Sequence, residues 1–317
     1  MLHKMVEGRL GNQMFQYAMM RSYQEKNKID DKINFNFSLL KREGKVEDGF
    51  CNQLTFFNLD YNKVVFEKKI SLNFIQRILF FNYCIHHKLL KLISKKNCFE
   101  IKKQKYELKI QKKNNKYGLY LYNYGYYNFD NNCKYKNRLF FGYNESYKYF
   151  DNIKEILYKE FTPKYDKLDK NKKMYDEIEK TESVCISIRR GDFFDNAFVN
   201  DCLVCTEKYF YNAIEKIKEK VHNPKFVVFS DDIKWIKENM NFPEGTIYET
   251  GDDPIWEKLR LMYSCKHFII SNSTFSWWAQ YLSRNETKIV VAPEKWRNFN
   301  ITSKEIYMPN WILTKVD

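Results

Sequence analysis

The second half of the chain alternates short apolar runs with amphipathic stretches. Apolar runs of three to five residues predict strands at 184–188, 226–229, 246–248, 268–270 and 289–291. The stretches between them predict helices at 207–221, 233–240, 254–265 and 275–282. Apolar strands that alternate with helices are typical of a parallel sheet buried on both faces. We therefore predict an α/β fold here, with its chemistry in the loops that follow the strands.

The first half has a weaker pattern. It predicts a strand at 4–6, a glycine-containing loop at 8–12 and a helix at 13–27. Residues 31–150 are aromatic, basic and poorly periodic, and they predict only helices near 72–94 and 146–160. A proline and several lysines interrupt the pattern at 161–173. We therefore predict two domains, residues 1–160 and residues 161–317.

The composition of the 317 residues indicates a folded globular chain. Hydrophobic residues make up 44% and aromatic residues 18%, which excludes an intrinsically disordered protein. No run of about 18 apolar residues is present, so no membrane-spanning helix is predicted. Residues 1–20 lack the apolar core of a signal peptide, and we therefore expect a cytoplasmic chain.

Positive charge is concentrated in one segment. The whole chain has 54 Lys and Arg against 40 Asp and Glu, and residues 86–117 hold eleven Lys against two Glu. This segment is either a site for a polyanion or an anionic membrane surface, or simply a solvated face, and the solvated face is favoured. The helix predicted just before it could lie on a membrane or pack on the core, and we favour the core. No nucleic-acid-binding motif is present, so a nucleic-acid partner is not predicted, whereas peripheral association with the inner membrane through 86–117 stays open.

Two loops carry candidate chemistry. Arg189 and Arg190 directly follow a predicted strand, and paired guanidinium groups suit a diphosphate, with Asp192 holding one of them in position. The alternative is a surface salt bridge. The second segment, residues 271–278, joins a strand to a helix, and its hydroxyls at 273, 274 and 276 with the first helical N–H groups form an anion cradle. Here the alternative is that Ser273 or Thr274 is only an N-cap.

Metal and cofactor motifs are missing from the sequence. No two aspartates stand at i and i+2, and Cys202 with Cys205 is a lone Cys-x-x-Cys pair without a second pair. The loop at residues 8–12 lacks the spacing of a dinucleotide fingerprint. We therefore predict neither a metal nor a cofactor.

Three segments together resemble a known family. They are residues 8–18 (GRLGNQMFQYA), residues 186–193 (ISIRRGDF) and residues 270–278 (ISNSTFSWW). Shorter matches at 229–232, 261–262 and 291–293 follow in the same order. The chain resembles glycosyltransferase family 11, the bacterial and animal α-1,2-fucosyltransferases.

The resemblance implies a fold and an activity. The fold would be GT-B, with two Rossmann-like domains facing a cleft, the acceptor on the N-terminal domain and GDP-fucose on the C-terminal domain. The activity would be inverting, metal-free transfer of L-fucose to the 2-hydroxyl of a terminal galactose on a surface glycan. Arg189 would neutralise the β-phosphate. The other donor-binding candidates are Arg190, Ser187, Asn272, Ser273, Thr274, Ser276, Glu257, Asn12 and Gly11.

Two positions depart from the family pattern. Ser187 stands where the family usually has His, and Lys258 stands where it usually has Asp. Both concern recognition of the base, and Glu257, Asp252 or Asp253 are candidate replacements for the missing carboxylate. Two alternative functions therefore stay open: a transferase of the same fold with another nucleotide sugar, and a basic module that binds polyanions without transferase activity.

The general base is the least determined part of the site. Glu7 ends the first predicted strand and precedes the glycine loop, so it is our candidate, with a solvent-facing strand end as the alternative. Asp192 is the rival, but two neighbouring arginines would lower its pKa and suit it to orienting a guanidinium instead. A transition state driven by the leaving group would need no strong base.

Overall fold

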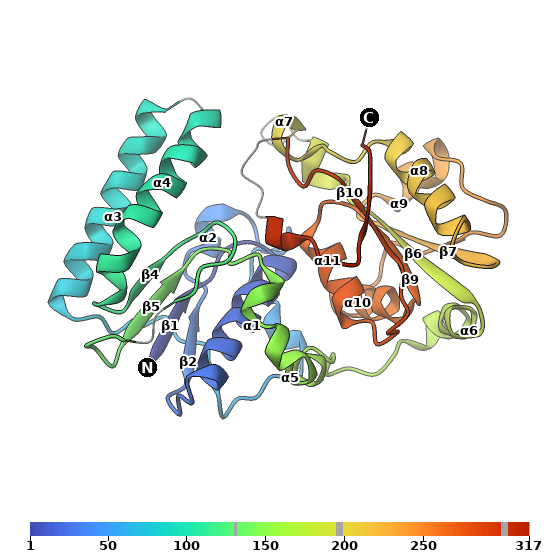
Figure 1. The fold of residues 1–317 in the computed structure, drawn as a ribbon. Coiled ribbons are helices and arrows are strands. Elements are labelled where there is room, and N and C mark those ends of the chain that lie inside the picture. Colours follow the sequence, from blue (N-terminus) through green and yellow to red (C-terminus); the bar gives the residue numbers. More distant parts are fainter. Residues whose placement is uncertain (95, 130–131, 195–198, 299–303, 317) are drawn as a thin grey trace. The chain divides into compact units, whose positions relative to one another are not determined.

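The structure is a computed structural model that describes residues 1–317 except 95, 130–131, 195–198, 299–303 and 317. The described chain forms two compact units. The first is built mainly from Met1–Thr162, and the second begins at Pro163. Each unit contains one parallel sheet with helices packed against it (Figure 1). The predicted α/β class, with two parallel-sheet units as in the GT-B fold, is thus confirmed.

The first unit contains a five-stranded sheet of order β3-β2-β1-β5-β4, in which every described pair is parallel. Its strands are β1 (Leu2–Met5), β2 (Ile33–Asn36), β3 (Val64–Val65), β4 (Leu119–Leu121) and β5 (Arg138–Phe141). Its helices are α1 (Leu10–Lys26), α2 (Leu40–Glu43), α3 (Phe74–Ile93), α4 (Lys96–Asn115) and α5 (Lys154–Glu160). The 3-10 turn η6 (Lys304–Ile306) also belongs to this unit. Four of the five strands lie within residues 31–150, where the sequence predicted none.

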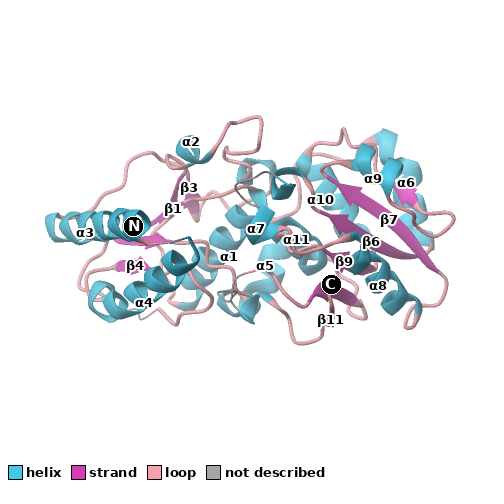
Figure 2. Cartoon of the chain, turned by 90° about the horizontal axis from the view of Figure 1, so that it is seen from above, coloured by secondary structure: helices cyan, strands magenta, loops and turns pink. Residues whose placement is uncertain are grey.

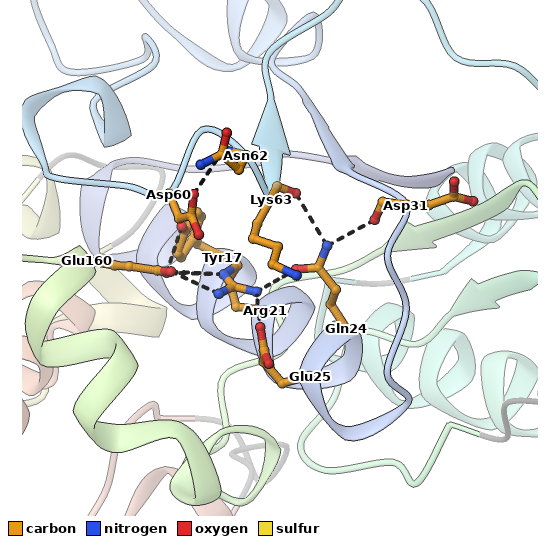
Figure 3. A network of polar contacts seen from close by, with 9 residues as sticks. All are labelled: Tyr17, Arg21, Gln24, Glu25, Asp31, Asp60, Asn62, Lys63 and Glu160. Carbon is orange, nitrogen blue, oxygen red and sulfur yellow. Dashed lines mark hydrogen bonds and ion pairs between the residues drawn. The ribbon is translucent and has the colours of Figure 1, made fainter.

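Helix α1 is fixed by a buried polar network (Figure 3). Arg21 forms an ion pair of 2.9 Å with Glu160 at the end of α5, and the Tyr17 hydroxyl donates to the same carboxylate at 2.8 Å. Arg21 also pairs with Glu25 one turn further along α1, at 2.8 Å. A buried carboxylate needs such partners, because its charge has lost water. The network therefore joins α1 to the last helix before the second unit.

The second unit contains a six-stranded sheet of order β11-β10-β9-β6-β7-β8, in which every described pair is again parallel. Its strands are β6 (Glu182–Ile188), β7 (Pro224–Ser230), β8 (Ile247–Tyr248), β9 (His267–Ile270), β10 (Val290–Pro293) and β11 (Ile312–Thr314). Its helices are α6 (Lys172–Lys180), α7 (Val199–Cys202), α8 (Glu207–Lys218), α9 (Ile233–Asn239), α10 (Ile255–Ser264) and α11 (Thr274–Leu282). All five predicted strands and all four predicted helices of this half are present, and β11 was not predicted. Thr206 caps α8, as expected.

The strand order creates a switch point beside β6 (Figure 2). The chain runs from β6 outward to β7 and β8, and then returns to β9 on the other side of β6 before continuing to β10 and β11. Loops that leave β6 and β9 therefore diverge to opposite faces of the sheet. In open parallel sheets this is the place where ligands bind, beyond the carboxyl ends of the strands.

Candidate functional site

The arginine loop leaves the carboxyl end of β6 and meets the loop that leaves β7. Arg189 Nη1 lies 2.7 Å from Asp231 Oδ2, and the backbone N–H of Arg190 donates to Asp231 Oδ1 at 2.8 Å. A Cβ atom added at Gly191 would collide with Asp231 Oδ2, so the glycine permits this approach. The Arg189 side chain remains 22% exposed. It is thus a positioned guanidinium that a ligand can still reach.

Arg190 is used differently from Arg189. Its guanidinium carbon lies 3.1 Å from the centre of the Trp235 ring and 4.2 Å from the centre of the Phe194 ring. Its Nε lies 3.5 Å from a carboxylate oxygen of Asp232, the N-cap residue of α9. These contacts hold the Arg190 side chain against the protein. Asp192 was the residue expected to orient an arginine, and its side chain lies outside the described part of the structure. Asp231 and Asp232 hold the two guanidinium groups.

Three serine hydroxyls join the end of β6, the loop after β9 and the first turn of α11. Ser276 Oγ lies 2.7 Å from Ser187 Oγ and 3.2 Å from Ser271 Oγ. Each of the three serines is at most 6% exposed. Ser187 and Ser276 were predicted to contact the donor, and the structure places their hydroxyls against each other. The cluster links the two loops at the switch point.

The first residues of α11, next to this cluster, are partly exposed. Ser273 is the N-cap residue of α11, but its side chain makes no capping hydrogen bond, and both Ser273 and Thr274 are partly exposed. The first turn of α11 contains no acidic residue that would oppose an anion. Its N-terminus therefore combines backbone N–H groups and two accessible hydroxyls, which suit a phosphate.

Asn272 holds two loops of its own unit. Its Nδ2 donates to the carbonyl oxygens of Cys202 at 2.9 Å and Trp296 at 3.0 Å. The thiol of Cys205 lies 3.5 Å from Asn272 Oδ1. With Asn272 only 6% exposed, the amide shapes the loops around the α11 start.

Glu257 also binds its own chain. Its Oε1 accepts hydrogen bonds from the backbone N–H of Leu168 at 3.1 Å and from Asn171 at 3.3 Å. Its Oε2 lies 3.4 Å from Arg260. The carboxylate is fully buried, so it fixes the segment that leads into α6.

The nearby acidic residues make similar contacts. Asp253 is buried and pairs with Lys170 at 2.9 Å, whereas the exposed Asp252 pairs with the same lysine at 3.0 Å. Asp253 also accepts a hydrogen bond from Asn171 at 3.0 Å. Both aspartates therefore act on the segment that Glu257 holds.

The sequence did not single out Glu249 as a candidate site residue. It lies with Lys258 at the carboxyl ends of β7 and β8. Lys258 Nζ lies 2.9 Å from Glu249 Oε2 and donates to the carbonyl oxygen of Ser230 at 3.0 Å. The other oxygen of Glu249 accepts a hydrogen bond from the backbone N–H of Ser230. Burial raises the pKa of Glu249, and the charge of Lys258 partly counteracts this. An acid directly after a short strand, nine residues before a lysine, was the signal available in the sequence.

Glu7 follows β1 at the carboxyl edge of the first sheet. Burial raises its pKa to about 7, and the nearby positive charges of Lys4 and Lys103 act in the opposite direction. Its Oε2 is buried and makes no hydrogen bond. Lys4 is fully buried and donates to Gly142 and to Asn144, the latter at 2.9 Å. A carboxyl group with a pKa near 7 can accept a proton at neutral pH.

The same edge carries further polar residues from α4 that the sequence did not single out. Glu107 is fully buried, accepts a hydrogen bond from the Tyr83 hydroxyl at 2.8 Å and accepts another from the backbone N–H of Asn123 at 2.9 Å. Burial raises the pKa of this carboxyl as well. Lys103 is 8% exposed and lies over the Tyr124 ring. Lys103 and Glu107 both belong to the lysine-rich segment 86–117, yet they are buried and both act on the pKa of Glu7.

Gly11 and Asn12 were predicted to lie in a loop, and this prediction is wrong. Helix α1 begins at Leu10, so both residues occupy its first turn. A Cβ atom at Gly8, where φ is +74°, would collide with the Asn12 side chain, which shows how closely the helix start folds over that glycine. The apolar spacing of residues 15, 19 and 23 placed the helix start three residues too late.

Groups of three or more His, Cys, Asp or Glu side chains that could hold a metal ion are not found among the described residues.

The sequence of the chain is similar to those of known proteins. A family model described as "Glycosyl transferase family 11" matches residues 1–315. An Escherichia coli protein named alpha-1,2-colitosyltransferase is 32% identical over 303 residues, which cover 91% of this chain and 90% of the relative. The Escherichia coli O-antigen biosynthesis glycosyltransferase WbnK is 29% identical, with 98% of this chain and 99% of WbnK aligned. The human galactoside alpha-(1,2)-fucosyltransferase 1 is 26% identical over 42% of this chain and 39% of its own length.

Proposed function

The chain belongs to glycosyltransferase family 11, and from this premise we propose that it transfers L-fucose from GDP-fucose to the 2-hydroxyl of a terminal galactose on a surface glycan. The transfer inverts the anomeric carbon. The second unit binds the nucleotide sugar and the first unit binds the acceptor. We place the reaction on the cytoplasmic side of the membrane.

The observation that carries this proposal is the pairing of Arg189 with Asp231 at the switch point of the second sheet. A carboxylate-held guanidinium presents fixed donors to a diphosphate, and the start of α11 supplies backbone N–H groups from the neighbouring loop. Charge develops on the diphosphate as the glycosidic bond breaks. Donors that are already in place stabilise that charge without reorganising, and such stabilisation is usually the largest catalytic contribution.

The acceptor hydroxyl loses a proton during the transfer. We propose Glu7 as the group that takes it, because the raised pKa of about 7 lets the carboxylate act as a base near neutral pH. We propose Lys258, which the buried Glu249 holds in position, as the recognition element for the base of the nucleotide. Both residues lie beyond β7 and β8, beside the arginine loop, and Lys258 stands where the family usually has Asp.

A second donor is favoured by one specific observation. The relative that is 32% identical over 91% of this chain is named as a colitosyltransferase. Fucose is 6-deoxy-L-galactose, and colitose lacks the 3-hydroxyl in addition. A site for colitose would differ from a site for fucose in the groups that face that one position.

The experiment that tests the proposal offers GDP-fucose and GDP-colitose in parallel, with lactose as acceptor. We expect GDP release and formation of 2'-fucosyllactose, identified by mass and by linkage. A strong preference for GDP-colitose would establish the second donor and reject the first. Thermal shifts with GDP, UDP, CDP and dTDP test the nucleotide separately, and a clear preference for a base other than guanine would reject both donors.

A further inference from the structure

Helix α3 is firmly attached to the first sheet by its inner face. Leu79, Phe80 and Tyr83 pack against the buried leucines of β4 and β5. Asn73 and Gln76 form a capping box at the helix start. The Gln76 side chain also donates to the carbonyl oxygens of residues 117 and 137. The core packing expected for this helix is thus present on one face, and the orientation of the opposite face is fixed.

The outer face of α3 is apolar as well. Large apolar side chains recur every three or four residues along the exposed side, at Phe74, Ile78, Phe81, Ile85, Leu89 and Leu92. We call this row the α3 stripe. Phe74 is 77% exposed, Phe81 64% and Leu92 81%. A helix that is apolar on both faces needs a second apolar environment, and a continuous exposed row of this kind marks an interaction site.

Positive charge accompanies the stripe. Helical spacing places Arg77, Lys88 and Lys91 along one border of it, and all three are exposed. Helix α4, which lies beside α3 (Figures 1 and 2), exposes further lysines at 102, 105, 109, 112 and 113. Of the eleven lysines in 86–117, only Lys103 is buried among the residues whose side chains are described.

We infer that the α3 stripe docks the protein on an anionic lipid surface. Its apolar side chains would enter the boundary between headgroups and acyl chains, and the bordering cations would meet the lipid phosphates. This combination distinguishes lipid from the other occupants. A second copy would bring together two segments with the same surplus of positive charge, and a nucleic acid would leave the apolar stripe in water.

The docking is interfacial, with α3 in the plane of the membrane. In the described part of the chain, no helix has the length and apolar character that crossing a bilayer requires. Because one face of α3 packs against the sheet, only the opposite face can contact a membrane. That geometry matches the membrane-lying helix that the sequence left as an alternative to core packing. It differs from attachment through the lysine-rich segment alone, because the apolar stripe begins twelve residues before that segment.

The test uses flotation with two kinds of vesicle, one of phosphatidylcholine alone and one of phosphatidylcholine and phosphatidylglycerol in equal amounts. The unmodified chain should float with the anionic vesicles and much less with the neutral ones. Phe81→Ser with Leu92→Ser should lower the partition coefficient by about tenfold or more, because each inserted apolar side chain contributes to binding. The matched control is Val46→Ser with Leu313→Ser, at two exposed apolar positions outside the stripe.

A charge series completes the test. Lys88→Gln with Lys91→Gln should weaken binding to anionic vesicles and make it less sensitive to salt, whereas Lys208→Gln with Lys220→Gln should not. Transfer between soluble donor and soluble acceptor should be unchanged in the Phe81→Ser, Leu92→Ser variant, so failure of docking and failure of the proposed activity are distinguishable.

Two outcomes would overturn the inference. Vesicle binding that depends on the lysines but not on the stripe would reduce the contact to polyanion binding. A dimer in light scattering that the Phe81→Ser, Leu92→Ser variant converts to a monomer, together with no vesicle binding, would identify a second copy as the occupant. Circular dichroism melts of each variant establish that the protein is folded in every case.

Discussion

Arg189 and Arg190 are neighbours in sequence, yet their side chains are committed to different tasks. Arg190 contacts two aromatic rings and Asp232, whereas Arg189 pairs with Asp231 and stays partly exposed. Arg189→Lys keeps the charge and removes the fork of donors. We expect kcat/KM to fall about 100-fold, which corresponds to roughly 3 kcal/mol of lost transition-state stabilisation.

Steady-state transfer assays measure this effect. Arg284→Lys is the matched control, because Arg284 is exposed just beyond α11, at the opposite end of that helix from its N-terminus. Near-normal kcat/KM in a folded Arg189→Lys protein would contradict a role for Arg189 in binding the diphosphate.

Glu7 makes a prediction about pH. Burial raises its pKa to about 7, so the unprotonated base is depleted as the pH falls through that value. We therefore expect kcat of the unmodified enzyme to decline below pH 7. Glu7→Gln should lower kcat by about 100-fold or more and abolish the decline, since a positioned general base contributes about 10²–10⁴-fold.

A pH profile at saturating donor and acceptor is the measurement, with Glu67→Gln as the control at an exposed carboxylate of the first unit. If Glu7→Gln keeps full kcat with normal acceptor binding, the reaction proceeds without this base. The alternative without a strong base would then be favoured.

Glu249 and Lys258 make a prediction about stability. Lys258→Met leaves a fully buried carboxylate without its cation, which should lower the free energy of unfolding by about 3 kcal/mol near neutral pH. Burial already raises the pKa of Glu249, and losing the lysine raises it further. Folding raises the pKa of this carboxyl above its value in the unfolded chain, which is about 4.3. The free energy of unfolding therefore falls as the pH rises above that value.

The deficit of Lys258→Met should therefore shrink as the pH is lowered toward about 5. Urea unfolding at several pH values measures it. The double variant Glu249→Gln, Lys258→Met carries no buried charge at this position and should recover most of the stability with little pH dependence. A deficit that is equal at all pH values would mean that Lys258 acts by packing alone.

At the scale of the elements, the contact between the loops after β6 and β7 depends on one glycine. A Cβ atom at Gly191 would collide with the Asp231 carboxylate, so Gly191→Ala should displace Asp231 from Arg189. We expect about a tenfold rise in KM for the donor, because the guanidinium loses the group that positions it. Glu244→Ala, in an exposed turn of the same unit, is the control substitution. Unchanged donor KM in Gly191→Ala would show that the loop has room to shift.

The elements of the second unit were predictable because their burial is simple. Strands buried on both faces read as apolar runs, and Val184, Phe226 and Phe268 each lie within such a run. Apart from β1, the strands of the first sheet were not predictable, because they have two to four residues and include polar side chains. Asn34 and Asn36 in β2 are buried, and their side-chain amides donate to backbone carbonyl oxygens. Polar residues in this sequence therefore occupy buried strand positions, which a hydrophobic pattern does not reveal.

The candidate site was predictable in its loops but not in its side-chain contacts. The arginine loop and the start of α11 follow strands on either side of the switch point, as the pattern required. Asn272 and Glu257 were expected to face the donor, yet both bind backbone groups of their own unit. Sequence spacing assigns a residue to a loop, whereas the direction of its side chain depends on which backbone groups would otherwise be unsatisfied.

At the scale of the whole molecule, the division into two units predicts where the nucleotide acts. If GDP binds at the switch point, only the second unit gains stability directly. A GDP concentration of about 100 times Kd adds about 2.7 kcal/mol to the free energy of unfolding of the unit that binds it. Hydrogen exchange should then slow at residues 186–191 and 270–276, while amides of β1 to β5 keep their rates. UDP at the same concentration is the control. Protection centred on the first sheet would contradict the assignment of the donor to the second unit, and the pairing of Arg189 with Asp231 would then be a surface salt bridge.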